Sequence, residues 1–331
     1  MRIFCARKWR IASAICGVLL AAAAAPAPAR AAHVQNAATR QAPDAQQATR
    51  SVVDETGRRI AMPADVRRIV SLAPNLTETL YALGADKLLV GDTTYCDVPE
   101  AAKSKPHVGG PMNPSLEVIV GLKPDLVVVA SINRYETVEA LEKVGVPVYE
   151  SDPRSIAELI GGIERLADAI GMAQQGRELA DKLRARVDVL EKNIAGKPRC
   201  RGLFVVWEDP LTSVGPKTFI ADAMRIAGAD SVVNSSQDWP HVSMEAVVHM
   251  QPDVLIFARD HGDASPELAD LRARPGWREL DAVKRGRIAV VSGEVDRPAP
   301  GLIDAVESLA RQLHSDAFEK SAAGSVHACS R

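Results

Sequence analysis

The chain has 331 residues, of which 25% are charged, and a formal charge of −2 at pH 7. Its first thirty-one residues hold five basic and no acidic side chains, so removal of this segment would leave a formal charge of −7. A mildly acidic chain of about 300 residues argues against nucleic acid or anionic lipid as the partner, and it is long enough for two lobes.

The N-terminus has the layout of a secretory signal peptide. Four basic residues among the first ten precede an apolar run over 11–25, and small residues that fit a cleavage site follow at 27–31. This run is shorter than the roughly 20 residues that a membrane span requires. Cys16 offers lipid anchoring as the alternative, although an isoleucine precedes it where a lipobox has a small residue. We therefore expect export to the periplasm by a cleavable signal peptide.

Strands and helices alternate through the rest of the first half. Residues 68–73 (RIVSLA) predict a short buried strand, and 75–84 have the apolar spacing of a helix that ends at a glycine. A cap residue followed by proline begins another helix near 113–115, before an apolar strand at 126–130 (LVVVA). This alternation is typical of α/β units with a parallel sheet.

The sequence also repeats itself. Residues 115–130 read SLEVIVGLKPDLVVVA and residues 243–258 read SMEAVVHMQPDVLIFA, and both copies follow a Gly-Ala-Asp tripeptide. In this register Tyr95 and Trp239 fall at equivalent places. A shared hydropathy pattern does not by itself place Ser-x-Glu and Pro-Asp at the same distance twice. We therefore expect two lobes of like topology.

A helical connector is predicted between the lobes. Its apolar spacing comes in two pieces with a break near Gly171, and the second piece would span about 30 Å, at 1.5 Å per residue. The expected fold class is α/β: two similar α/β lobes with central, mainly parallel sheets, joined by a single long connecting helix. The expected boundaries are 1–31 for the signal peptide, 32–51 for a disordered leader, 52–153 for the N-terminal lobe, 154–196 for the connector, 197–314 for the C-terminal lobe and 315–331 for a flexible tail.

No motif indicates catalysis or metal binding. The sequence has no G-x-S-x-G elbow, P-loop, H-E-x-x-H or G-x-G-x-x-G, and its histidines are scattered. Cys96, Cys200 and Cys329 lack C-x-x-C spacing, which leaves one disulfide open and favours neither a disulfide framework nor a metal cluster. We expect no enzymatic activity, no metal and no cofactor.

Four segments and the long helix together resemble the helical-backbone, or class III, family of periplasmic solute-binding proteins. The segments are RRIVSLAPNLTETLYALGA, YCDVP, GGPMNPSLEVIVGLKPDLVV and WPHVSMEAVVHMQPDVLI, and the resemblance covers residues 52–313. It is closest to the family's cobalamin-binding members. It implies a monomeric component of an ABC importer that captures cobalamin or a related corrinoid between its lobes and delivers it to an inner-membrane permease with its ATPase.

Other functions remain open alongside this one. Heme- and ferric-siderophore-binding proteins share the scaffold, and Tyr95, Tyr135 or His107 would supply an axial ligand to heme. A ligand-sensing module without a transporter is the alternative of a different class.

The resemblance implies ligand-binding roles for Tyr95, Trp239 and Arg297, with Trp207 as a fourth member. Open α/β sheets bind ligands beyond the carboxyl ends of their strands, and opposed aromatic side chains suit a flat macrocycle with amide edges. Each residue has a structural alternative: a core position for either tryptophan, a turn cap for Tyr95, and a surface ion pair for Arg297. One departure is the stretch 109–111 (GGP), where cobalamin binders carry an aromatic residue.

Glu117 and Glu245 occupy the same place in the two repeats, each in the first turn of its helix. A purely structural role is one explanation, because an acid at a helix N-terminus stabilises the helix by about 0.3–1 kcal/mol through the helix dipole. The resemblance implies that a glutamate on each lobe meets arginines of the permease, through charge-assisted bonds that fix orientation as well as affinity. We therefore expect both glutamates to dock the protein on its transporter.

Overall fold

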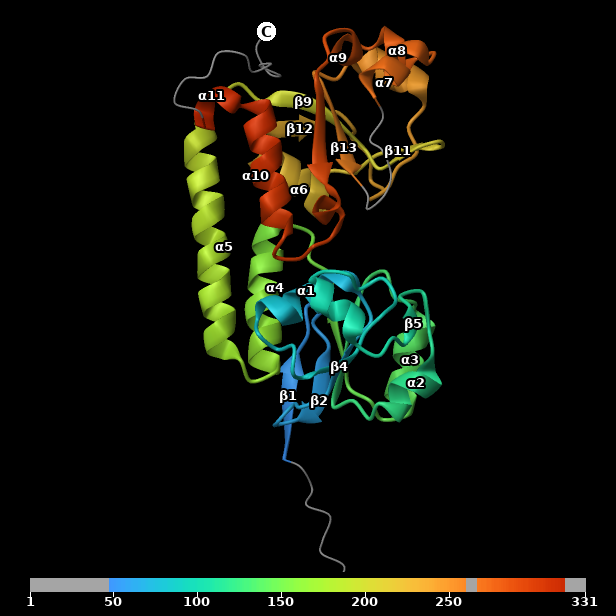
Figure 1. Ribbon diagram of the computed structural model, residues 1–331, viewed down its shortest axis with the longest axis vertical. Helices are drawn as coiled ribbons and strands as arrows, with labels where there is room; N and C mark the ends of the chain where they lie inside the picture. The colour runs from blue at the N-terminus through green and yellow to red at the C-terminus, as the bar shows by residue number, and fades with distance from the viewer. Residues whose placement is uncertain (1–47, 260–266, 319–331) are drawn as a thin grey trace, which may run out of the picture. The chain divides into compact units, whose positions relative to one another are not determined.

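Two four-stranded parallel sheets form the centre of the fold in the computed structural model, which describes residues 48–259 and 267–318 (Figure 1). The first sheet, in the order β4-β3-β7-β8, consists of β3 (Ile69–Ser71), β4 (Leu89–Gly91), β7 (Leu126–Ala130) and β8 (Val148–Ser151). The second, in the order β12-β9-β13-β14, consists of β9 (Cys200–Val205), β12 (Ala229–Ser231), β13 (Val254–Arg259) and β14 (Ile288–Ser292). Every strand pair in both sheets is parallel. We call each sheet with its helices a lobe, and the expected fold class is confirmed.

The two lobes have one topology, as the internal repeat predicts. In each, a strand, a helix, the edge strand, a second helix, a third strand, a third helix and a last strand follow in the same chain order. The helices of the first lobe are α1 (Pro74–Ala82), α2 (Leu116–Gly121) and α3 (Tyr135–Lys143). Those of the second are α6 (Phe219–Ile226), α7 (Met244–Met250) and α8 (Leu268–Ala273), with α9 (Asp281–Lys284) and α10 (Leu302–Leu313) following.

Short elements complete the described chain. Three antiparallel hairpins pair β1 (Thr49–Val53) with β2 (Arg59–Pro63), β5 (Gly109–Gly110) with β6 (Asn113–Pro114), and β10 (Trp207–Glu208) with β11 (Leu211–Thr212). Turns of 3₁₀ helix lie at η1 (Glu100–Ser104), η2 (Trp277–Glu279) and η3 (Gly293–Asp296).

The repeated Pro-Asp has the same structural role in both lobes. The Asp125 carboxylate accepts the backbone N–H of Arg68 at 2.9 Å, at the start of β3. The Asp253 carboxylate accepts the N–H of Arg201 at 2.8 Å, in the equivalent strand β9. Each aspartate therefore satisfies a backbone donor of the neighbouring strand and fixes the register of the two central strands.

The same two arginines hold the helix ends. Arg68 donates to the carbonyl of Leu122 after α2, at 2.6 Å, and Arg201 donates to the carbonyl of Met250 at the end of α7, at 2.8 Å. The residues that precede the two prolines, Lys123 and Gln251, have positive φ values of 49° and 43°. A left-handed residue and a basic side chain both terminate a helix and satisfy its last carbonyls.

A helical hairpin connects the lobes. It consists of α4 (Ile156–Ala169) and α5 (Ala173–Ile194), which lie side by side and are joined at Gly171, whose φ is 80° (Figure 1). The N–H of Ile156 donates to the Asp222 carboxylate of α6, at 2.9 Å. The longer helix, α5, contacts α4 and also α6 and α10 of the second lobe. With 22 residues it is about 33 Å long.

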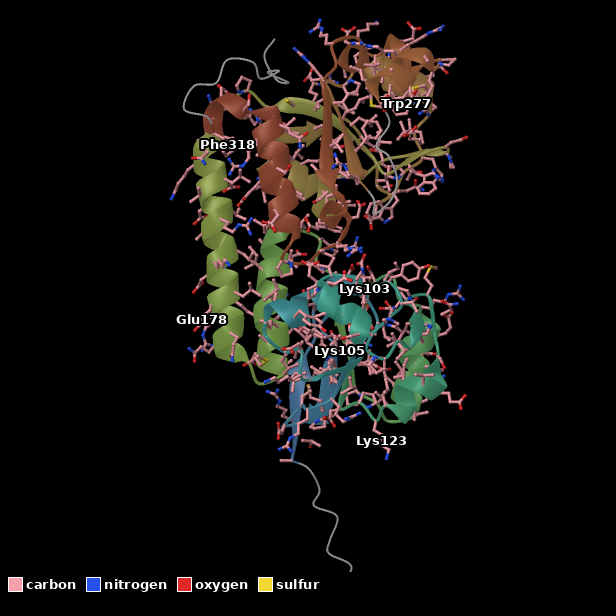
Figure 2. The ribbon with its side chains drawn as sticks, in the orientation of Figure 1. Lys103, Lys105, Lys123, Glu178, Trp277 and Phe318 are labelled. Atoms are coloured by element: carbon pink, nitrogen blue, oxygen red, sulfur yellow. The ribbon has the colours of Figure 1, made fainter. Side chains whose placement is uncertain are left out.

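The structure corrects the predicted leader and tail at their inner ends. β1 begins at Thr49, inside the predicted disordered leader 32–51, because this polar segment pairs with β2 over five residues. α11 (Ser315–Phe318), at whose end Phe318 is labelled in Figure 2, lies inside the predicted tail 315–331. The Arg311 guanidinium stacks 4.8 Å from the ring centre of Phe318. The predicted signal peptide 1–31 and the rest of both segments lie outside the described residues.

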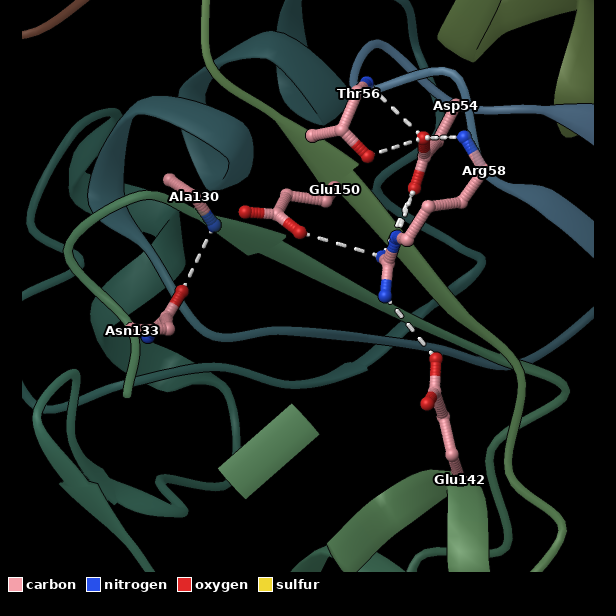
Figure 3. A network of polar contacts seen from close by, with 7 residues as sticks. All are labelled: Asp54, Thr56, Arg58, Ala130, Asn133, Glu142 and Glu150. Carbon is pink, nitrogen blue, oxygen red and sulfur yellow. Dashed lines mark hydrogen bonds and ion pairs between the residues drawn. The ribbon is translucent and has the colours of Figure 1, made fainter. Parts of the chain in front are cut away.

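An ion-pair network attaches the β1–β2 hairpin to the first lobe (Figure 3). The Arg58 guanidinium lies 2.9 Å from the buried Asp54 carboxylate, 3.1 Å from Glu142 of α3 and 3.4 Å from Glu150 of β8. Asp54 also accepts hydrogen bonds from the backbone and hydroxyl of Thr56. The hairpin is thus held by a fully paired buried carboxylate.

The largest apolar cluster extends through both lobes and the connector. It includes Leu80 of α1, Ile163 of α4, Leu183 of α5 and Val306 of α10, all at most 2% exposed. Cys96 is free and buried, whereas Cys200 is disulfide-bonded. Within the described ranges, none of the helices has the length and apolarity to cross a membrane.

Candidate functional site

Exposed aromatic side chains gather beyond the carboxyl ends of the parallel strands. Tyr95 follows β4 and is 65% exposed, and Tyr135 follows β7 and is 71% exposed. In the second lobe, Trp207 follows β9 and is 62% exposed, and Trp239 follows β12 and is 48% exposed. These four are the exposed large aromatics of the described chain. Since burial in a core would hide such rings, their exposure at strand ends is typical of a binding surface.

Tyr95 stands against the glycine hairpin that departs from the cobalamin-binding pattern. A Cβ on Gly110 would lie 3.7 Å from the Tyr95 ring. Gly109 has a φ of 104° and accepts the N–H of Thr94 at 3.0 Å, so the hairpin and the tyrosine loop are joined by backbone. The tyrosine loop is therefore held beside the glycine hairpin by this backbone hydrogen bond.

Asn133 fixes the loops around this tyrosine. Its side-chain oxygen accepts the N–H of Ala130 at the end of β7, at 2.8 Å (Figure 3). Its amide donates to the carbonyls of Leu72 after β3, at 2.9 Å, and of Pro111 after the glycine hairpin, at 2.8 Å. One buried side chain thus ties together three segments at the carboxyl edge of the first sheet, including the segment that supports Tyr95 and the turn that leads to Tyr135.

The two tryptophans lie on hydrogen-bonded neighbouring segments. Trp207 pairs with Thr212 across the β10–β11 hairpin. The Thr212 hydroxyl lies 3.0 Å from Nδ1 of His241, two residues after Trp239, and the N–H of Ser213 donates to the carbonyl of Pro240 at 3.1 Å. The structure therefore brings the Trp207 hairpin and the Trp239 loop together.

Arg297 reaches the loop that carries Tyr95. Its guanidinium forms an ion pair with Asp97, two residues after Tyr95, at 2.9 Å, and its side chain is 22% exposed. Arg297 therefore forms an ion pair, as its structural alternative predicts. The pair joins the two lobes, however, and does not lie on an open surface. A second pair, between Arg154 and Asp238, connects the start of the connector to the residue before Trp239.

A buried glutamate lies behind this arginine. Glu78 of α1 is 8% exposed and accepts the N–H of Gly301 at 2.8 Å. Burial raises the pKa of Glu78; the Gly301 hydrogen bond lowers it, the Glu294 carboxylate raises it further, and Arg297 opposes the rise. The surroundings of Arg297 are therefore rich in acids.

Glu117 and Glu245 are exposed in the first turns of α2 and α7. Ser115 and Ser243 cap the two helices, with oxygen-to-nitrogen distances of 3.4 and 3.1 Å. Neither glutamate has a hydrogen bond or ion pair to any residue in 48–259 or 267–318. Both carboxylates are therefore available to an external partner, whereas their helices are already capped by serine.

The described residues contain no group of three or more His, Cys, Asp or Glu side chains that would hold a metal ion. His107 and His241, which flank the aromatic loops, are each hydrogen-bonded through Nδ1, His107 to the buried Asp92 carboxylate at 2.8 Å. Burial raises the pKa of Asp92, and its His107 partner lowers it.

Two cavities among the described residues lie away from the aromatic side chains. One of about 530 Å³ is lined by β1, the end of α4 and the start of α5, including Arg50, Arg165 and Arg177. The other, of about 260 Å³, lies near His314 and the end of α5. Neither of these two cavities is lined by the expected ligand residues, and the exposed aromatic side chains define the candidate site.

Sequence reasoning missed three residues of this region as members of the site. Asn133 and Asp97 carry no local signal, because their partners lie far along the chain. Tyr135 is expected from the sequence only as an axial ligand to heme, although it lies a few residues after the strand 126–130, as Tyr95 lies a few residues after its own strand. That similar placement is the signal that the sequence offers.

The chain has two parallel-sheet lobes of one topology, joined by a helical hairpin, with aromatic side chains beyond the strand ends. This combination defines a class of two-lobed solute-binding proteins. The sequence model of the periplasmic binding protein family matches residues 69–294, and the chain belongs to that family.

Relatives refine this assignment. The chain is 29% identical to the uncharacterized ABC transporter substrate-binding lipoprotein YvrC of Bacillus subtilis, over 82% of this chain and 87% of that protein. It is 28% identical to the vitamin B12-binding protein of Vibrio cholerae, over 77% and 91%.

Solved structures agree with the family. The structure is similar to that of the periplasmic vitamin B12-binding protein BtuF of Vibrio cholerae, with a TM-score of 0.65, 27% identity, and coverage of 74% of this chain and 95% of that one. It is similar to the periplasmic heme-binding protein RhuT of Roseiflexus, with a TM-score of 0.68, 25% identity and coverage of 76% and 99%. The chain is thus a class III substrate-binding protein of an ABC transporter, a family that binds ligands without a cofactor and acts outside the cytoplasm.

Proposed function

We propose that this protein captures cobalamin or a related corrinoid between its lobes and delivers it to an inner-membrane permease with its ATPase. The observation that carries the proposal is the position of Tyr95, Tyr135, Trp207 and Trp239. All four rings are exposed, and each follows a parallel strand at its carboxyl end. Flat aromatic faces suit the apolar face of a corrin ring, and the neighbouring polar groups suit its amide edges. The vitamin B12-binding relatives support this ligand class.

Heme is the second candidate, because two of the exposed aromatics are tyrosines and a heme-binding protein is among the similar structures. A phenolate or imidazole would have to ligate the iron. Calorimetry of the mature protein against cyanocobalamin, cobinamide, heme and a ferric siderophore separates the candidates. Saturable cobalamin binding with quenched tryptophan emission supports the first proposal. A sharpened Soret band with heme, together with no response to any corrinoid, would refute it.

We further propose that Glu117 and Glu245 dock the two lobes on arginines of the permease. Both carboxylates are exposed and lack a partner in the described chain, and the repeat gives each lobe one. Replacement of either by alanine is expected to leave ligand affinity unchanged and to reduce uptake in cells. Glu178→Ala, on the exposed side of α5 (Figure 2), is the matched control. Impaired ligand binding by the purified Glu117→Ala or Glu245→Ala protein, with normal uptake, would contradict docking.

The proposal also includes processing and assembly. Residues 1–31 are removed during export, and the mature protein is a monomer. The first lobe extends from β1, which begins at Thr49, to residue 153, the connector spans 154–196, and the second lobe begins at 197. Mass spectrometry of the exported protein gives the cleavage point, and a mass that retains the first 31 residues would contradict it.

A further inference from the structure

The outer face of α2 is apolar and lies uncovered. Leu116, Val118 and Val120 are 38%, 42% and 43% exposed, and Met112, just before the helix, is 53% exposed. Ile119 is the buried residue of α2 and packs in a core cluster of the first lobe. The four exposed side chains belong to none of the hydrophobic clusters in residues 48–259 and 267–318. Neighbouring apolar side chains left exposed in this way are typical of a surface that another protein binds.

The second lobe has the same helix with its large apolar side chains covered. In the register of the repeat, Met244, Ala246 and Val248 of α7 take the places of the three exposed residues of α2. Met244 and Val248 are partly buried and pack against a cluster that includes Trp277 of η2. Met244 also lies so close to Gly276 that a Cβ on this glycine would meet its side chain. The remaining place stays exposed and holds alanine, so α7 leaves no large apolar side chain open to solvent.

The cover differs because the two lobes connect their last strands differently. In the second lobe α8, η2 and α9 lie between β13 and β14, and η2 contacts all of α7, α8 and α9, which gather at one end of this lobe (Figure 1). In the first lobe α3 is the only helix between β7 and β8, and it contacts α2 but leaves the outer face exposed. The described chain therefore covers the apolar face of α7 and not that of α2, so we expect another molecule to cover α2.

One charge lies within this apolar face. Glu117 stands between Leu116 and Val118, and it is the only charged residue from 108 to 122. Its exposed carboxylate has no hydrogen bond or ion pair within the two described ranges. The complementary surface is therefore apolar with a single cation opposite the carboxylate. Apolar contacts around a charge-assisted hydrogen bond exclude water and strengthen it.

Resting on the proposed docking of Glu117, we infer that the apolar face of α2 binds an apolar surface of the permease subunit, around the arginine that meets this glutamate. The second lobe docks through Glu245 without an equivalent apolar contact, because η2 already covers α7. The two lobes therefore hold the transporter by unequal means, the first by charge and apolar burial and the second by charge. Leu116 and Val120 lie one helical turn apart, beside each other on this face, and are the residues to test.

The test measures binding of the full mature chain to proteoliposomes that hold its permease with the ATPase. The wild-type protein is compared with Leu116→Gln, Val120→Gln and Glu117→Ala. Val189→Gln is the matched control, since Val189 is a 56% exposed valine of α5, in the connector. Glutamine is a good helix former, so the replacements change apolar surface to polar surface and keep the helix. Dissociation constants for cyanocobalamin are measured on the same proteins.

Leu116→Gln and Val120→Gln are each expected to weaken binding to the proteoliposomes about tenfold and to leave the dissociation constant for cyanocobalamin unchanged. Val189→Gln is expected to bind as the wild-type protein does. If Glu117→Ala weakens docking while the two α2 variants dock normally, the apolar contact is wrong and the glutamate docking stands. If Glu117→Ala also docks normally, the proposed docking fails and this inference with it.

A cross-link covers the case in which a glutamine variant does not fold. Val120 is replaced by p-benzoylphenylalanine, which is photoreactive and apolar, and Val189 is replaced likewise as the control. On irradiation with the same proteoliposomes, position 120 is expected to cross-link to the permease subunit, identified by mass spectrometry, and position 189 is expected not to. No adduct from position 120, or equal adducts from both positions, would overturn the inference.

Discussion

Replacement of Asn133 by alanine tests how the site is held together. The side chain is 9% exposed and makes three hydrogen bonds of 2.8–2.9 Å, to Ala130, Leu72 and Pro111. Each buried group that loses its partner costs about 1–3 kcal/mol. Because water reaches some of the freed groups, we expect Asn133→Ala to lower the free energy of unfolding by about 3 kcal/mol in total.

The assay is urea unfolding followed by circular dichroism, with Asn193→Ala as the control. Asn193 is exposed near the end of α5, so its replacement is expected to change stability by less than about 0.5 kcal/mol. The same Asn133→Ala protein, under native conditions, is expected to bind cyanocobalamin more weakly, since the Tyr95 support loses its tie to β7. If Asn133→Ala costs no more than Asn193→Ala, the three bonds do not hold the edge of the sheet and the reasoning fails.

Further predictions concern the exposed tryptophans, the contact between α4 and α5, and the buried Glu55. Trp207→Ala and Trp239→Ala are each expected to weaken corrinoid binding about tenfold, with little change in the free energy of unfolding, because both rings are exposed. Calorimetry measures both quantities, and a loss of stability without a loss of affinity would show that the rings belong to the core. Gly176→Ala is expected to destabilise the protein by about 1–3 kcal/mol, because the new Cβ would lie 2.4 Å from the Cβ of Ala167 across the α4–α5 contact. Gly161→Ala is the control, since its Cβ would meet only the flexible end of Arg165. In thermal melts this control is expected to be neutral or stabilising. Burial raises the pKa of Glu55 to about 7. The contribution of this group to the free energy of unfolding is therefore complete below about pH 4.5 and is lost as the pH rises through 7. In Glu55→Gln, the decrease in stability over this pH range is expected to be smaller by about 1–3 kcal/mol, and identical pH profiles for the two proteins would refute this prediction.

The sequence predicted the local architecture because its signals are short in range. The Ser-x-Glu and Pro-Asp pairs of the two repeats predicted two like lobes, and each pair has the same structural role in both copies. The serines cap α2 and α7, and Asp125 and Asp253 accept backbone N–H groups near the start of the neighbouring strands. The buried strand at 126–130 and the break at Gly171 were likewise predicted from spacing and residue type.

The predicted leader and tail were wrong at their inner ends for the same reason, namely that sequence signals are short in range. The first three residues of Thr49–Val53 are polar, and they join a strand because β2 pairs with the whole segment. Ser315–Phe318 looks like part of a loose tail until Phe318 packs under Arg311. Neither partner is visible from local composition, because each contact depends on where the rest of the chain lies.

The sequence by itself determined the two α/β units, their order and the aromatic residues that follow their strands. The tertiary structure alone decided that Arg297 meets Asp97, 200 residues away, and that Asn133 joins three separate segments. Hydrophobic periodicity and capping act over a few residues, whereas the charge around a binding site is the sum of side chains that only packing brings together.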